Sequence, residues 1–149
     1  MELLHEDITR GIIGCAFEVH NCLGYGFLEK VYQRAMQVEL KLRGFSAEIE
    51  KEIRVLYKHE EVGYYKADIL VNELVIVELK VAKCYSSLDE AQLLNELKAT
   101  GIRVGMLATL VNRAWNSGDL TIDRCFVLIN GFILFSSMAG FGFCLLKGS

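Results

Sequence analysis

The chain has 149 residues, 52% of them hydrophobic and 23% charged, which is the composition of one folded globular domain. Its 8 Phe and 6 Tyr exclude a disordered chain, and the absence of proline excludes collagen. A formal net charge of −3 argues against a generic, charge-driven grip on nucleic acid or on an anionic membrane, although it is compatible with a local basic groove.

The five cysteines include no Cys-x-x-Cys pair, and their number is odd. This pattern indicates neither a zinc site nor a disulfide framework. We therefore expect a reducing, cytoplasmic setting. The first ten residues contain early acids and no apolar core, so they do not resemble a signal peptide.

Two helices are predicted at the start of the chain. Apolar residues recur at steps of three or four over residues 6–22, and the segment Gly24-Tyr25-Gly26 ends this pattern. A second apolar face runs over residues 27–43 and stops at Gly44.

Three strands are predicted next. The period changes to two over residues 46–57, which predicts the first strand. The β-branched and aromatic runs 64–71 and 74–81 are separated by Asn72-Glu73, a pattern typical of a hairpin. The apolar run 74–77 indicates a central strand that is covered on both faces.

A third helix and further strands complete the predicted domain. The capping-box pattern in residues 86–90 predicts a helix that starts there and ends at Gly101. Strands are then expected over residues 102–111 and 121–129. The order ααβββαβ(β) is that of one α/β domain, which we expect to occupy residues 1–130.

The C-terminal end is unusually apolar. Residues 125–146 carry no charge and are long enough to cross a bilayer, so a tail anchor is one interpretation. Glycine, asparagine and serine dilute this apolarity, and we favour a last strand followed by an apolar extension over residues 131–149. Such an extension would pack on the domain or on another subunit, giving a homo-oligomer.

Charged residues interrupt the predicted apolar hairpin. Asp68 lies ten residues before Glu78, and Lys80 follows two residues later. Because residues i and i+2 of a strand face the same side, Glu78 and Lys80 project together from a strand that we expect to be buried. Burying such charges is costly unless they pair or bind a metal. A strand-end salt bridge between the two is the alternative without function.

The hairpin places Asp68 beside the stretch from Val77 to Glu78, so two carboxylates could converge on an oxygen-ligated cation such as Mg²⁺. A strict two-residue turn, however, pairs Asp68 with Val77 and puts the two carboxylates on opposite faces. A functional site therefore requires a three-residue loop or a bulge, and we predict such an irregularity.

These residues resemble the PD-(D/E)xK nuclease superfamily, whose signature is an Asp on one strand and Glu-x-Lys on the next. Residues 26–32 are similar to the G-x-x-E-x-x-Y motif that names a small family within it, and flanking segments match over about residues 8–111. The resemblance implies a restriction-endonuclease-like mixed β-sheet flanked by helices. It also implies a nuclease or nuclease-like phosphodiesterase that uses Mg²⁺ or Mn²⁺ and acts on DNA or RNA.

The resemblance implies roles for individual residues. The catalytic set would be Asp68, Glu78, Lys80, Glu29 and Gln92. The metal ligands would be Asp68, Glu78 and Glu29. Candidates for contact with nucleic acid are Lys98, Arg103 and Tyr32. Each position also has an ordinary explanation: Glu29 suits the first turn of a helix, Tyr32 suits packing, and the remaining helical and loop side chains suit exposure to solvent.

Two positions depart from the family's pattern. Asp89 stands where a histidine is common at the start of the third helix, and Glu96 stands where an aromatic residue is common. The core residues of the signature are intact. The alternative function is not enzymatic. The protein would then be a non-catalytic binding or assembly module on the same fold, which self-associates through its apolar C-terminus.

Overall fold

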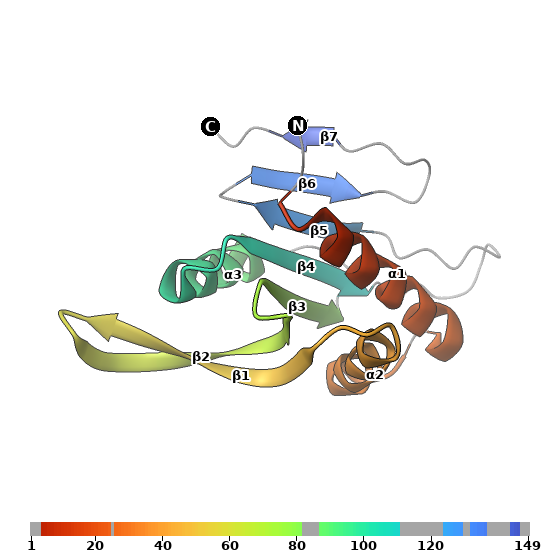
Figure 1. Cartoon of the computed structure of the whole chain (residues 1–149), viewed down its shortest axis with the longest axis horizontal. Helices are drawn as coiled ribbons and strands as arrows, with labels where there is room; N and C mark the ends of the chain where they lie inside the picture. The colour runs from red at the N-terminus through yellow and green to blue at the C-terminus, as the bar shows by residue number, and fades with distance from the viewer. Residues whose placement is uncertain are drawn as a thin grey trace.

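The computed structural model describes residues 4–24, 26–81, 87–110, 124–129, 132–136 and 144–146, with side chains as far as Ala108 (Figure 1). Within these residues the elements are α1 (Glu6–Leu23), α2 (Glu29–Leu42), β1 (Ala47–Tyr57), β2 (Glu60–Val71), β3 (Val75–Val81), α3 (Ser87–Thr100), β4 (Val104–Leu110), β5 (Arg124–Ile129), β6 (Phe132–Ser136) and β7 (Cys144–Leu146).

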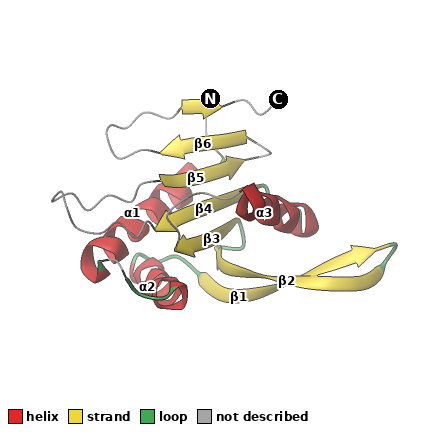
Figure 2. Ribbon diagram, turned by 180° about the vertical axis from the view of Figure 1, so that it is seen from behind, coloured by secondary structure: helices red, strands yellow, loops and turns green. Residues whose placement is uncertain are grey.

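The described strands form one mixed sheet in which they stand in chain order. β3 and β4 pair in parallel, and the other neighbours pair antiparallel. A parallel pair needs a crossover connection, and α3 lies within it. α1 and α2 cover one face of the sheet and α3 covers the other (Figures 1 and 2).

Each face of the sheet has its own core. α1 and α2 pack their apolar stripes, including Ile12, Tyr32 and Met36, against one face. α3 packs Leu93 and Leu97 against the other face. The prediction that β3 is covered on both sides is confirmed, because alternate β3 side chains belong to different cores: Val75, Val77 and Leu79 to the first and Ile76 to the second.

The predicted helices and the first four strands are confirmed with small differences at their ends. The predicted two-residue turn between β2 and β3 was wrong. Three residues separate β2 from β3, because Val71 pairs with Val75. Asn72 explains this length: its N–H donates to the Ser46 carbonyl at 2.9 Å, and its Oδ1 accepts from the Ser46 N–H at 2.8 Å. These contacts hold Asn72 in a left-handed conformation outside the ladder.

Two further strands extend the sheet in a region where the sequence predicts none. β6 pairs with β5, and β7 pairs with β6. Short apolar runs separated by glycine and serine suit strands that add to an open sheet edge. No helix in the described part of the chain is long and apolar enough to span a membrane.

Gly105 allows α3 to approach the sheet closely. A Cβ atom at this position would lie 2.9 Å from Cδ1 of both Leu93 and Leu97. We expect Gly105→Ala to destabilise the fold by about 1–3 kcal/mol through overpacking. The matched control is Gly63→Ala on β2, where nothing lies within 4 Å of an added Cβ. Urea denaturation should show Gly63→Ala unchanged or slightly stabilised, and equal effects of the two variants would contradict this view of α3 packing.

Candidate functional site

β2 and β3 separate at Asp68. Their backbone pairing runs from Val71 and Val75 to Ile69 and Val77, where it ends. One step further on, side chains replace the ladder. The Asp68 N–H donates to Glu78 Oε1 at 3.0 Å, and the Leu79 N–H donates to Asp68 Oδ2 at 2.8 Å. Two carboxylates therefore accept the hydrogen bonds that strand carbonyls accept elsewhere in the sheet. We call this point the fork.

The three-residue turn makes this arrangement possible. Continuing the observed register by one step places Asp68 directly opposite Glu78, whereas a two-residue turn would place it opposite Val77. The irregularity that the sequence requires for a functional site is therefore present.

Glu29 approaches the end of β3 from helix α2. It is the first residue of α2, and its Oε2 accepts a hydrogen bond from the N–H of Val81, the last residue of β3, at 3.1 Å. The charge of Glu29 is close enough to raise the pKa of Asp68. The structure therefore places Glu29 at the end of β3 and near Asp68.

α3 contributes a carboxyl group that the sequence does not identify as a site residue. Glu96 is fully buried at 0% exposure, and its Oε1 accepts from Gln92 Nε2 at 3.0 Å. Among the described residues no donor reaches Glu96 Oε2. The carboxyl of Glu96 interacts electrostatically with the Glu78 carboxyl and raises its pKa. Gln92 thus joins the cluster through Glu96.

A signal for Glu96 does exist in the sequence. Gln92 and Glu96 have the i, i+4 spacing that places two side chains on one helix face. Glu96 also stands between Leu93 and Leu97, which are both buried. An acid in the buried stripe of a helix needs a partner, and here Gln92 donates to Glu96 Oε1 while the Glu78 carboxyl lies close enough for Glu96 to raise its pKa.

Three carboxyl groups of the cluster, those of Asp68, Glu78 and Glu96, have raised pKa values. Burial, with the negative charges of Asp68 and Glu96, raises the pKa of Glu78 to about 9. Burial also raises the pKa of Asp68 and of Glu96 above their ordinary values. The Lys80 ammonium opposes both of these shifts. Acids this close cannot all ionise without a proton or a cation among them.

The structure does not bring the three nucleic-acid candidates to this cluster. Tyr32 is 1% exposed, and its hydroxyl donates to the Gly24 carbonyl at 2.6 Å, so it fastens the loop before α2 and offers no surface. Lys98 is exposed two residues beyond Glu96, which turns it away from the sheet. Arg103 precedes the β4 end that pairs with Val75, about 13 Å along the strand from the level of Glu78.

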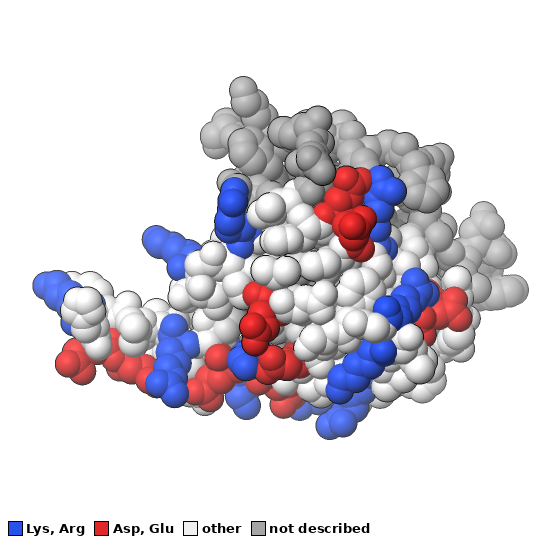
Figure 3. All heavy atoms as spheres, viewed as in Figure 1, with Lys and Arg blue, Asp and Glu red and all other residues white. Residues whose placement is uncertain are grey.

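Charges on the surface are mixed. On the face shown in Figure 3, acidic and basic side chains are interspersed over α1, α2 and the β1–β2 hairpin, with uncharged surface between them. No single-sign field covers the described part of this face. Any recognition of a charged ligand must therefore depend on local groups rather than on a broad potential.

The chemistry of the donors suits a hard divalent cation, because carboxylate oxygens are the ligands that Mg²⁺ and Mn²⁺ prefer. No group of three or more His, Cys, Asp or Glu side chains within the described ranges is arranged to hold a metal ion. The pair Asp68–Glu78 nevertheless fits Mg²⁺, which commonly uses one or two carboxylates and completes its shell with water and substrate phosphates. The unpaired oxygen of Glu96 is consistent with such a site.

A comparison with known protein families identifies the superfamily of this chain. The family described as the PD-(D/E)XK nuclease superfamily matches residues 6–117, which is most of the chain. The chain belongs to the PD-(D/E)XK nuclease superfamily. The match runs from α1 into the region after β4 and so includes the whole carboxylate cluster of this superfamily member. No curated protein and no solved structure matched the chain.

Replacing Glu78 with Gln tests the crowding of acids in this superfamily member. The pKa of Glu78 is about 9 in the folded protein, against roughly 4.3 in an unfolded chain. The folded state therefore holds a proton that the unfolded state loses between these values. Metal-free wild type should lose stability as the pH rises through this window, and Glu78→Gln should remove much of the loss.

At pH 8 we expect Glu78→Gln to be more stable than wild type by on the order of a few kcal/mol, because the unfolded wild type is stabilised by losing the Glu78 proton and the unfolded variant is not. At pH 3 the difference should vanish, because that pH lies below both pKa values and Glu78 is then neutral in both states. Thermal unfolding in chelator checks this, with Glu52→Gln, exposed on β1, as the control. A Glu78→Gln variant that is less stable than wild type at pH 8 would contradict the account.

Proposed function

We propose that this protein is a divalent-metal-dependent nuclease or nuclease-like phosphodiesterase that hydrolyses phosphodiester bonds of nucleic acid. One observation carries the proposal: Asp68 and Glu78, from neighbouring strands, meet at the fork with the Lys80 charge beside them. Membership of the superfamily supports it. The finer placement in the GxxExxY family rests on residues 26–32 and on Glu29, which belongs to that motif and reaches the cluster.

Asp68 and Glu78 would hold the metal, Mg²⁺ or Mn²⁺, with Glu29 beside them. When bound, such an ion lowers the pKa of a bound water and offsets charge on the phosphate. Two backbone N–H groups orient the chain's own carboxylates. The Leu79 N–H fixes Asp68 Oδ2, and the Asp68 N–H fixes Glu78 Oε1. The second oxygen of each carboxyl accepts neither of these two bonds.

Lys80 supplies a positive charge on the face shared with Glu78. We assign it to the attacking water or to the charge that develops on the phosphate, because a preorganised donor is most effective in a buried site. Gln92 is assigned a supporting role, since its amide orients Glu96 rather than the reacting groups. The raised pKa of Glu78 keeps a proton on that carboxyl next to Glu96, which reduces the repulsion between the two groups.

Nucleic acid is the substrate class that this chemistry serves. Lys98 and Arg103 are exposed but lie away from the carboxylates, so we assign them to phosphates remote from the cleaved bond. Tyr32 is left out of the interface because it is buried.

The first test of the proposed function measures metal and cleavage together. We expect wild type to bind Mn²⁺ in calorimetry and to cleave a mixture of single- and double-stranded substrates only with metal. Asp68→Ala and Glu78→Ala should lose both properties, whereas the exposed control Glu52→Ala should keep both. Folded wild type that binds no ion at millimolar metal, with or without an oligonucleotide, would contradict the proposal and favour the non-catalytic module.

Lys80→Met separates chemistry from metal binding. We expect kcat to fall about 10²–10³-fold, the usual cost of removing one donor to the transition state, while the affinity for Mn²⁺ stays within a few-fold. Lys66→Met, an exposed change on β2, is the control and should leave kcat unchanged. An unaltered kcat in Lys80→Met would remove Lys80 from the mechanism.

A further inference from the structure

Asp68 lacks a regular strand partner on either side. On the β3 side the ladder ends one step before it. On the β1 side Ile49 pairs with Ile69 and Lys51 with Ala67, but the step between them is missing. Glu50, which would face Asp68 at that step, has a φ of 53°, in the left-handed region that a non-glycine residue seldom adopts. The backbone of Asp68 therefore depends on side chains for its hydrogen bonds.

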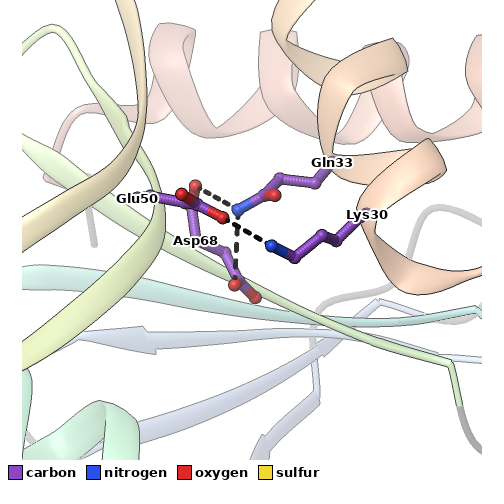
Figure 4. A network of polar contacts seen from close by, with 4 residues as sticks. All are labelled: Lys30, Gln33, Glu50 and Asp68. Carbon is purple, nitrogen blue, oxygen red and sulfur yellow. Dashed lines mark hydrogen bonds and ion pairs between the residues drawn. The ribbon is translucent and has the colours of Figure 1, made fainter.

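Gln33 of α2 supplies one of these bonds. Its side chain is buried at 5% exposure, and its Nε2 lies 2.9 Å from the Asp68 carbonyl oxygen and 3.5 Å from Asp68 Oδ1 (Figure 4). Both of these atoms are acceptors, so the amide nitrogen must face them. Gln33 thus takes the place of the missing β1 donor and also touches the carboxylate.

The Asp68 carboxylate is consequently held from two directions. Leu79 of β3 donates to Oδ2, and Gln33 of α2 lies beside Oδ1. On the outside of the same interruption, Lys30 Nζ pairs with Glu50 Oε1 at 3.1 Å, and both side chains are exposed (Figure 4). One turn of α2 therefore spans the irregular step of β1 and β2.

We propose that Gln33 is a positioning residue for Asp68. It satisfies the Asp68 carbonyl in place of a strand and so sets the direction in which the Asp68 carboxylate points at the fork. The consequence for metal binding and catalysis rests on the proposed function above, whereas the effect on Asp68 geometry does not. Groups that orient a metal ligand commonly change affinity or activity 10–100-fold when they are removed.

Gln37 offers a matched control on the same helix. It lies one turn after Gln33, and its Nε2 donates to the Ala47 carbonyl at 2.9 Å. Both glutamines therefore join α2 to a strand carbonyl with bonds of equal length. Only the bond made by Gln33 ends at a residue of the fork.

The experiment compares Gln33→Met with Gln37→Met, which both remove the donor and keep a long side chain. We expect similar decreases in Tm for the two variants. Gln33→Met should bind Mn²⁺ 10–100-fold more weakly in calorimetry and lose kcat at saturating metal, with KM for the nucleic-acid substrate little changed. Gln37→Met should keep the wild-type affinity and kcat.

A third readout needs neither metal nor substrate. The Leu79 amide proton bonds to Asp68 Oδ2, so hydrogen exchange at Leu79 reports the position of that carboxylate. We expect faster exchange at Leu79 in Gln33→Met than in Gln37→Met, measured at equal global stability. Equal exchange in the two variants would overturn the positioning role even if both enzymes are active. Faster exchange, with wild type that neither binds metal nor cleaves, would support the positioning role and refute the proposed function.

Discussion

The fork in the sheet depends on an exchange of two hydrogen bonds between Asp68 and the strand that carries Glu78. A backbone N–H in a sheet interior must find an acceptor, and at this step each strand supplies a carboxylate in place of a carbonyl. The exchange ends the ladder without leaving the two N–H groups unsatisfied. It also fixes two acids side by side in a place where water is largely excluded.

The fork also explains how groups from opposite helical layers meet. An intact sheet would keep α2 and α3 apart, since they cover different faces. Where β2 leaves β3, Gln33 reaches Asp68 from α2, while Glu96 reaches Glu78 from α3. The cluster is therefore assembled from two strands and two helices. Burial and the neighbouring negative charges raise the pKa values of its acids, so the cluster is costly to ionise without a cation.

Local patterns in the sequence predict most of the fold. Helical periodicity locates α1 and α2, the capping signal starts α3 at Ser87, and the apolar run in β3 identifies a strand covered on both faces. The turn length depends on a contact between Asn72 and Ser46, 26 residues apart, which no local pattern contains. The same holds for Gln33: it lies next to Tyr32 in the buried stripe of α2, but its partner Asp68 is 35 residues away.

A carbon-detected NMR titration of the Glu78 side-chain carboxyl, without and with Mg²⁺, probes the carboxylate cluster directly. We expect the pKa of Glu78 to be about 9 in the metal-free protein. Saturating Mg²⁺ should lower this pKa below neutrality, because a cation replaces the proton on Glu78. A Glu78 carboxyl that titrates near its ordinary value, or whose titration does not respond to Mg²⁺, would contradict the proposed cation site.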